Sequence, residues 1–479
     1  MRLRHTLYVL SALLGLNFAF VSADTIQLPD IGDSAGAVLS PDQERRIGVE
    51  FLRRIRLNFN LIDDPEINEY ISSLGNRLAE NSDNPSQSFT FFVIDDSRIN
   101  AFAAPGGYIG INSGLITATE SESELASVVS HEIAHVTQRH LARAVEAQGK
   151  LNLPSLAALV AAIIIGTQNS ELGQATLAAS QAATLQAQLN FTRSNENEAD
   201  YFGIQTLANS NLDPNAMASF FEHLQQASRY YSSPPEFLST HPVSTTRIAN
   251  ARNRAQSYPY RQVASSIEYH LVREKLHLRN SNAQGAIKRY QALLKSEQYL
   301  NKAAAEYVYS IALANAEQYQ QAFAQLDPLL KKYSTNLAFI RAKATILFQS
   351  GSINEALELY KATLKNYPHD HPTTVYYARA LLQVGKAKQA RLLLHKHAPF
   401  RHGDASFYKL LSFAESEAGF KLEAHQSLAE FHYLNGQTNA AIQQLDTALR
   451  LPSDDFYLQE KIQARRDQLK QLLLAESKF

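Results

Sequence analysis

The pattern of apolar and polar positions predicts two halves of different structure. In the first half, Ser40 reads as an N-cap and Pro41 as the first residue of a helix that should reach about residue 56. The aromatic and β-branched segments 89–94 and 108–111 predict two strands. From about residue 262 onward the strand signals vanish and helical periodicity remains. The predicted fold class is therefore mainly α, with an α+β half that contains a small β-sheet and a second half built of helices.

The helical half contains an internal repeat. Alanines recur at intervals of 34 residues, and a leucine or tyrosine follows each of them four residues later. These alanines are Ala322, Ala356, Ala390 and Ala424. A small residue at this period lets two helices approach closely, and the bulky residue one turn later fills the contact. The pattern resembles the tetratricopeptide repeat, which predicts a solenoid of helix pairs.

The N-terminus has the features of a secretory signal peptide. Arg2 and Arg4 precede an apolar run at 7–20, which is shorter than the roughly 20 residues needed to span a bilayer. Small residues end this segment at Ala23, as signal peptidase requires. We therefore expect residues 1–23 to be cleaved and the mature chain to be exported, in a Gram-negative cell to the periplasm. The expected domains are then an α+β domain at 24–261 and the repeats at 262–479.

Composition narrows the chemistry that the chain can perform. Among its 479 residues, 45 lysines and arginines nearly balance 46 aspartates and glutamates, which gives no sign of nucleic-acid binding. The chain contains no cysteine, so disulfide scaffolds, thiolate metal sites and cysteine nucleophiles are excluded. Any metal ion must therefore be bound by histidine, aspartate or glutamate.

One helix predicted from Ser121 onward carries the sequence His-Glu-x-x-His at 131–135. Residues four apart lie on one face of a helix, so both imidazoles, of His131 and His135, can reach one zinc ion. Glu132 lies one helical step round, where it can take a proton from a water molecule at the metal. The segment predicts a zinc site with Glu132 as its general base.

The third ligand decides the subclass of zinc site. A metzincin would carry glycine and histidine at the positions that Gln138 and Leu141 occupy. His140 lies five residues after His135, about 140° round a continuous helix, so we do not expect it to bind the same metal ion. We expect it to be either solvated or in contact with a ligand from outside the site.

A downstream acidic helix offers the alternative. Glu196 and Asp200 are four residues apart and share one face, whereas Glu198 points away from it. We expect Glu196 to be the third zinc ligand and Asp200 to orient a ligand histidine.

These motifs resemble a known family. The His-Glu-x-x-His segment with Glu196 and Asp200, preceded by the segment at 100–107, is similar to the gluzincin peptidases related to HtpX and the CAAX prenyl protease. Together with the signal peptide and the repeats, it resembles their soluble periplasmic branch. The resemblance implies one zinc ion per chain and the hydrolysis of proteins. It also implies that the clients are outer-membrane β-barrel proteins and that the repeats bind the barrel-assembly machinery.

The resemblance assigns roles to two further segments. Gly106, Gly107, Tyr108 and Ile109 would form the edge strand that aligns an extended substrate by β-augmentation. We therefore expect these four residues to bind the substrate backbone.

In the family's pattern a histidine and an arginine six residues later face the metal, which here are His241 and Arg247. They would stabilise the developing oxyanion. Alternatively, His241 would occupy the open position of the metal as a fourth ligand and keep the enzyme latent, with the segment at 230–235 as a mobile gate.

The sequence thus predicts a zinc metalloendopeptidase that degrades misassembled outer-membrane proteins and assists their assembly. The alternative that we keep open is a chaperone or scaffold that acts chiefly through the repeats, with proteolysis latent.

Overall fold

The computed structural model describes residues 39–148, 193–227, 235–279 and 281–476. The signal peptide expected at 1–23 and most of the gate expected at 230–235 lie outside these ranges. The elements of the first half are α2 (Pro41–Asn58), α3 (Pro65–Glu80), β1 (Thr90–Ile94), β2 (Ala101–Ala104), β3 (Tyr108–Asn112), α4 (Ser113–Ala118), α5 (Glu122–Thr137), α6 (His140–Gln148), α9 (Arg193–Asn209), α10 (Ala216–Ala227), α11 (Glu236–Thr240) and α12 (Thr245–Ala255).

Helices and short turns make up the second half. Its elements are α13 (Ile267–Arg279), α14 (Ala283–Ser296), α15 (Lys302–Asn315), α16 (Tyr319–Lys332), α17 (Leu337–Gln349), α18 (Ile353–Asn366), α19 (His371–Gln383), α20 (Ala387–His397), η2 (Ala398–Phe400), α21 (Ala405–Glu417), α22 (Lys421–Leu434), α23 (Thr438–Leu449) and α24 (Phe456–Glu476). Among the described residues, no helix is both long enough and apolar enough to cross a membrane.

The predicted helix starts are confirmed by their caps. The backbone N–H of Gln43 donates to Ser40 Oγ at 3.3 Å, and the N–H of Ser40 donates back to Gln43 Oε1 at 2.8 Å. Ser121 Oγ accepts from the N–H of Glu124 at the start of α5. These side chains satisfy donors that the first turn of a helix would otherwise leave unpaired.

A three-stranded sheet lies at the centre of the first half, with the strand order β1-β3-β2. β1 runs parallel to β3, with Thr90 opposite Tyr108, and β2 runs antiparallel to β3. The two strands predicted from the sequence are β1 and β3. β2 was not predicted, because its sequence of three alanines and one phenylalanine lacks the β-branched residues that indicate strands.

Helices cover both faces of this sheet. Apolar residues of α3 and α5 share one buried cluster with Phe91, Val93, Ile109 and Ile111. On the opposite face, α2 packs against Phe92 and Phe102. Successive side chains of β1 point to opposite faces of the sheet. The sheet therefore lies between two layers of helices, and α5 packs directly against it.

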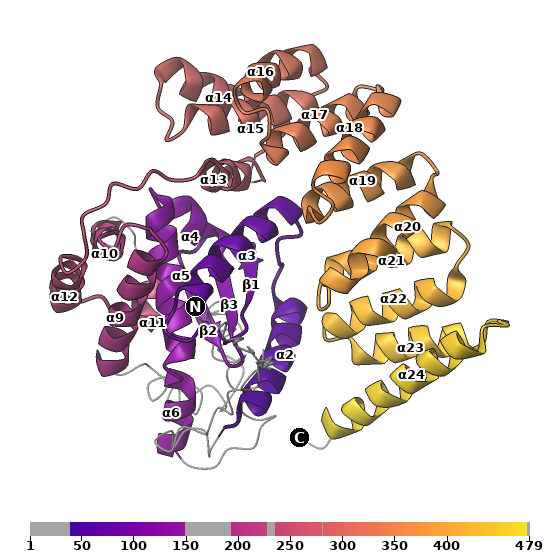
Figure 1. Ribbon diagram of the computed structural model, residues 1–479, viewed down its shortest axis with the longest axis horizontal. Helices are drawn as coiled ribbons and strands as arrows, with labels where there is room; N and C mark the ends of the chain where they lie inside the picture. The colour runs from indigo at the N-terminus through magenta and orange to yellow at the C-terminus, as the bar shows by residue number, and fades with distance from the viewer. Residues whose placement is uncertain (1–38, 149–192, 228–234, 280, 477–479) are drawn as a thin grey trace, which may run out of the picture.

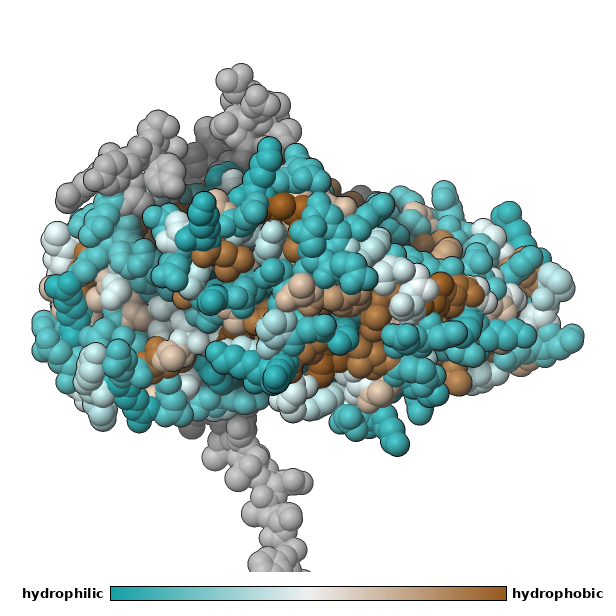
Figure 2. Space-filling model, turned by 90° about the horizontal axis from the view of Figure 1, so that it is seen from above, coloured by the Kyte–Doolittle hydropathy of each residue, from teal (hydrophilic) through white to brown (hydrophobic). Residues whose placement is uncertain are grey.

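The second half is an arc of antiparallel helix pairs, which runs from α14 to α24 around the first half (Figure 1). The alanines of the 34-residue period are buried at the helix crossings, where Ala322, Ala356 and Ala390 have no exposed surface. The predicted solenoid of small-residue crossings is therefore confirmed. Hydrophilic residues cover most of the face seen from above, and hydrophobic ones gather in a band in the middle of that view (Figure 2).

Charged residues join the two halves at distant points of the arc. In the early repeats, the Glu66 carboxylate of α3 contacts Lys275 Nζ at 2.5 Å and Arg341 Nε at 2.6 Å. In the late repeats, Arg53 of α2 donates to the carbonyl of Tyr433 and to the hydroxyl of Thr438. The arc is thus anchored on α3 and on α2.

Candidate metal centre

The two histidines of the His-Glu-x-x-His segment lie on one face of α5. Their Nε2 atoms are 2.9 Å apart, and both side chains are almost fully buried. One helical turn separates residues 131 and 135, so the same face of the helix presents both rings.

α9 packs along α5 and brings the acidic segment to these rings. Glu196 Oε2 lies 3.5 Å from His131 Nε2, and Oε1 lies 3.5 Å from His135 Nε2. Gly203 permits this packing, because a Cβ atom at that position would lie 3.3 Å from the backbone nitrogen of His131. Burial alone would raise the pKa of Glu196, but His241 and His131 hold it well below its usual value, so the carboxylate is charged.

A third imidazole completes the cluster. The ring of His241, which follows α11, places Nδ1 3.0 Å from Glu196 Oε1 and 3.3 Å from His131 Nε2. This ring stacks on Phe237, with 4.8 Å between the ring centroids. One ligand atom from each of these three histidines and Glu196 lies within 4.8 Å of the others.

These donors fit a zinc ion. Tetrahedral zinc with bonds of about 2.0–2.1 Å places its ligand atoms about 3.4 Å apart, and the separations among His131, His135 and Glu196 run from 2.9 to 3.5 Å. Imidazole nitrogen and carboxylate oxygen are the ligands expected in a protein without cysteine. The ring of His241 lies beside this triad, and the four ligand atoms lie within 4.8 Å of one another.

Asp200 and Arg247 support the cluster from outside. Asp200 Oδ1 lies 3.0 Å from His131 Nδ1, on the opposite side of the ring from the metal position. Arg247 donates to both oxygens of Asp200 at 2.8 Å, and its Nη1 lies 2.8 Å from Glu196 Oε2. Burial would lower the pKa of His131, but Asp200 and Glu196 raise it to about 9. Through these contacts Arg247 is bound to the carboxylates of both Asp200 and Glu196.

His140 and Glu198 form a second support. As expected, His140 is not among the candidate ligands, and it supports one of them from outside: its Nδ1 lies 2.7 Å from His135 Nδ1, and its Nε2 lies 3.1 Å from Glu198 Oε2. The contact with Glu198 was not predicted, and the helix is not continuous here, because α5 ends at Thr137 and Arg139 takes a left-handed conformation with φ of 53°. This break turns the chain and brings His140 back beside the ligand ring.

Glu132 is buried and faces the sheet. Burial raises the pKa of its carboxyl group, and the backbone N–H of Ala103 in β2 donates to it. Its Oε1 lies 3.5 Å from His241 Nε2. The carboxylate thus sits between the cluster and the free edge of β2.

The position of β3 corrects the expected edge strand. Tyr108 and Ile109 lie in the central strand, where both sides of the backbone pair with β1 and β2, so they cannot add a substrate strand. Gly106 and Gly107 form the preceding turn, with φ of 75° and 81°, and pack against neighbouring backbone. The strand at the edge beside the cluster is β2. Because the backbone groups of successive residues point to opposite sides of a strand, the N–H of Ala103 points outward, to Glu132.

Comparison with known proteins agrees with this geometry. The model of peptidase family M48 matches residues 65–255, and a tetratricopeptide repeat model matches residues 347–412. The chain is 37% identical to a Vibrio cholerae protein over 94% of each chain. It is also 35% identical to the β-barrel assembly-enhancing protease of Escherichia coli K12, over 94% of this chain and 92% of that one. The chain belongs to the β-barrel assembly-enhancing protease family. Members of this family are metallopeptidases, so the chain is a zinc endopeptidase, and the cluster contains donors of the kind that bind its metal ion.

More distant relatives match a shorter part of the chain. The mitochondrial metalloendopeptidase OMA1 of Schizosaccharomyces pombe is 29% identical over 37% of this chain and 50% of its own length. The predicted resemblance to gluzincin peptidases with tetratricopeptide repeats is therefore confirmed. Because such repeats stack into extended binding surfaces, the second half is suited to protein–protein interaction.

Proposed function

We propose that His131, His135 and Glu196 hold one zinc ion and that Glu132 is the general base of peptide-bond hydrolysis. The observation that carries this proposal is the convergence of these buried donors within 4.8 Å beside a buried carboxylate. Zinc at this point would supply a Lewis acid that lowers the pKa of water and polarises the scissile carbonyl.

Glu132 performs the proton transfers. Its carboxylate takes a proton from the attacking water and passes it to the nitrogen of the leaving amine when the C–N bond breaks. The raised pKa favours the first step, because a base of higher pKa accepts the proton from water more readily. Exclusion of water by the surrounding helices strengthens the electrostatic interactions on which the reaction depends.

The substrate would pair with β2. The outward backbone groups of Ala101 and Ala103 face the same side as Glu132, so an extended peptide added there would present its carbonyls to the metal position. This assignment replaces the substrate-binding role expected for 106–109.

His241 would act as a latch on the fourth position. Its distances of 3.0 and 3.3 Å to ligand atoms leave no room for a substrate carbonyl while the ring stays in place. After release, the same ring would be placed to stabilise the oxyanion. Arg247 would then position Glu196 and Asp200, since its donors are engaged with these carboxylates.

The proposed cellular role is inferred from the similarity to the relatives. We infer that residues 1–23 direct the chain to the periplasm and are removed. The catalytic domain at 24–261 would then degrade misassembled outer-membrane β-barrel proteins. The repeats at 262–479 would bind these clients and the barrel-assembly machinery. The buried position of His241 also favours a second candidate, a chaperone in which proteolysis stays latent until the latch opens.

Replacement of the base tests the proposal. Glu132→Gln keeps the size of the side chain, so the variant should bind one zinc ion per chain and unfold as the wild type does. Its cleavage of β-casein, an unfolded protein, should fall at least 100-fold, because general-base catalysis contributes about 10²–10⁴-fold. Equal cleavage by the two proteins would refute the assignment of the base. Equal support of barrel assembly by the inactive variant would favour the chaperone.

A further inference from the structure

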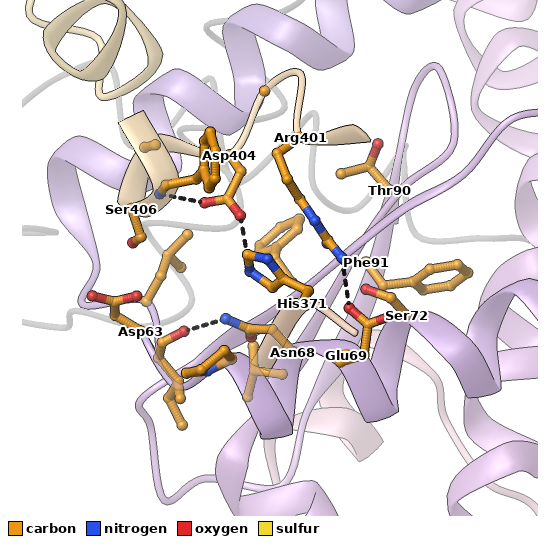
Figure 3. Close-up of a pocket in the computed structure, with 18 of the residues that line it drawn as sticks. Asp63, Asn68, Glu69, Ser72, Thr90, Phe91, His371, Arg401, Asp404 and Ser406 are labelled. Carbon is orange, nitrogen blue, oxygen red and sulfur yellow. Dashed lines mark hydrogen bonds and ion pairs between the residues drawn. The ribbon is translucent and has the colours of Figure 1, made fainter. Parts of the chain in front are cut away.

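A cleft of about 480 Å³ separates the sheet from the late repeats (Figure 3). One wall is β1 with the residue before it, at 89–93, and the other is the turn between α20 and α21, at 400–407. Glu69 and Ser72 of α3 line its floor. We call this cleft the β1 groove. Its volume falls in the range of ligand-binding clefts.

The outer edge of β1 faces this groove with unpaired backbone groups. The N–H of Thr90 donates to the carbonyl of Gly107 at 2.9 Å, so Thr90 faces β3. Backbone groups of successive residues point to opposite sides, and Phe91 and Val93 therefore face outward. The carbonyl of Val93 accepts from the N–H of Ile62 at 2.9 Å. No residue in the described ranges is hydrogen-bonded to the outward N–H or C=O of Phe91.

An isolated β-bridge already pairs with the end of this edge. Leu61 forms an antiparallel bridge with Ile94, and the N–H of Asp95 donates to the carbonyl of Asn60. The ladder then stops, and the edge continues unpaired along the groove toward Phe89. An added strand would continue a ladder that the protein itself begins.

The edge lacks the usual protection against strand addition. The sequence at 89–93 is Phe-Thr-Phe-Phe-Val, with no lysine, proline or glycine, whereas exposed edges normally carry such residues. Here the repeats stand opposite the edge and limit access to it. The groove therefore excludes the edge of a folded sheet but leaves space for a single extended chain.

The positively and negatively charged side chains that line the groove are equal in number. The lining residues with full charges are Arg56, Arg379, Arg401, Asp63, Glu69 and Asp404. Arg401 contacts Glu69 at 3.1 Å, as Figure 3 shows, and Arg379 lies 3.8 Å from Asp63. A groove without net charge suits an uncharged backbone rather than an anion.

We propose that the β1 groove binds one extended strand of an unassembled client protein by β-augmentation. This inference rests on the proposed function, in which the clients are β-barrel proteins whose strands lack partners before assembly. The sheet then offers two edges with different outcomes. A strand on β2 lies beside Glu132 and is cut, whereas a strand on β1, four strand spacings or about 19 Å away across the sheet, is held and not cut.

The absence of cysteine allows a direct test. Ser406→Cys places a thiol in the groove, and Ser416→Cys places one on the exposed side of the same helix as a matched control. Both are made in the Glu132→Gln variant. The probe is a ten-residue peptide of alternating valine and threonine with a thiol-reactive end. We expect adduct formation at 406 to be at least tenfold faster than at 416, and equal rates would overturn the proposal.

N-methylated peptides test the mode of binding. Methylation of alternate amides blocks one edge of the probe strand and leaves the other free, so its affinity should stay within about threefold of the parent peptide. Methylation of consecutive amides blocks both edges and should weaken binding at least tenfold. Equal affinity of the two methylated peptides would show that the groove recognises only the side chains of the peptide, which contradicts β-augmentation.

Filling the groove gives an independent check. Ser406→Trp should abolish binding of the peptide, and Ser416→Trp should retain it. A dimer of the full chain that Ser406→Trp dissociates would identify a second copy as the occupant and overturn the proposal. Cleavage of β-casein by the wild type, measured in parallel, separates the two claims. Cleavage without groove binding refutes this inference alone, and loss of cleavage in the zinc-loaded wild type refutes the proposed function.

Discussion

Asp200 shows how a residue outside the metal cluster controls a ligand within it. Its carboxylate lies 3.0 Å from His131 Nδ1 and is itself held by two hydrogen bonds from Arg247. Burial would raise the pKa of Asp200, but Arg247 and His131 lower it below the usual value, so the group stays charged. A charged acceptor fixes the tautomer of His131 that leaves Nε2 free for zinc.

Replacement of this acceptor should therefore weaken zinc binding. In Asp200→Asn the shape is kept but the charge is lost, and we expect the zinc affinity to fall about 10–100-fold. Competition with a chelator measures the affinity. Asn197→Ala, on the exposed side of the same helix, is the control and should bind zinc as the wild type does. An unchanged affinity in Asp200→Asn would argue against its role.

The sequence predicted these residues where a regular helix was sufficient. Spacings of four residues identified His131 with His135 and Glu196 with Asp200 correctly as neighbours, because α5 and α9 are uninterrupted there. For His140 the spacing predicted correctly that it is not a ligand, but not how its ring reaches His135, since the end of a helix at Thr137 cannot be read from spacing alone. Only the left-handed turn at Arg139 brings that ring to His135.

Between elements, the approach of α9 to α5 determines whether a metal site exists. Gly203 lies in the contact, and an added Cβ would come within 2.9 Å of Met217 Cε and 3.3 Å of the His131 backbone nitrogen. Glu196 lies two turns earlier on the same helix, so a displacement at Gly203 moves this ligand away from the histidines.

Gly203→Val should separate the two helices. Overpacking of a buried contact costs about 1–3 kcal/mol, and we expect that loss in the free energy of unfolding together with weaker zinc binding. Gly285→Val is the control, because Gly285 lies on an exposed turn of α14 far from the site. Urea unfolding and chelator competition measure the two effects. Normal zinc affinity in Gly203→Val would contradict the account of this contact.

The sheet shows what element-level prediction misses. β1 and β3 were predicted from their aromatic and β-branched residues, but the order of strands depends on contacts that no local pattern records. The expectation that β3 forms the edge failed for this reason. β2 was not predicted, because alanine is a poor indicator of strands. The backbone of β2 nevertheless faces Glu132.

For the whole molecule, the repeat period predicted the solenoid but not how it closes on the catalytic half. That closure depends on buried contacts between residues far apart in the sequence, such as Glu66 with Arg341. Burial would raise the pKa of Glu66, but Lys275 and Arg341 lower it from 4.5 to about 2. Nearby in the repeats, burial lowers the pKa of His371 to about 2 and that of His397 to about 4.

These shifts set the direction of the pH dependence. Below its normal pKa of 6.5, a histidine of the unfolded chain takes up a proton that His371 and His397 cannot accept in the fold. Below pH 4.5, the unfolded chain also protonates Glu66, which stays charged in the fold until about pH 2. The stabilisation that these three groups contribute should therefore be complete above pH 6.5 and should be lost as the pH decreases toward 2.

Glu66→Gln tests this contact between the halves. Loss of one partner from a buried ion pair costs about 3–5 kcal/mol, because Lys275 and Arg341 keep their charges. We expect that loss near pH 7 and a weaker pH dependence below 4.5, both measured by urea unfolding. Glu80→Gln, at the exposed end of the same helix, should leave both unchanged. Equal stability of the wild type and Glu66→Gln would contradict the anchoring of the repeats on α3.

The central claim is that His131, His135 and Glu196 hold zinc while His241 closes the fourth position. X-ray absorption at the zinc edge of the zinc-loaded protein measures the ligand atoms directly. We expect three imidazole nitrogens and one or two oxygens in the wild type, and two imidazole nitrogens with additional oxygen in His241→Ala. Two imidazole nitrogens in both proteins would contradict the latch. If His131→Ala and Glu196→Ala both kept their zinc, the site itself would be contradicted.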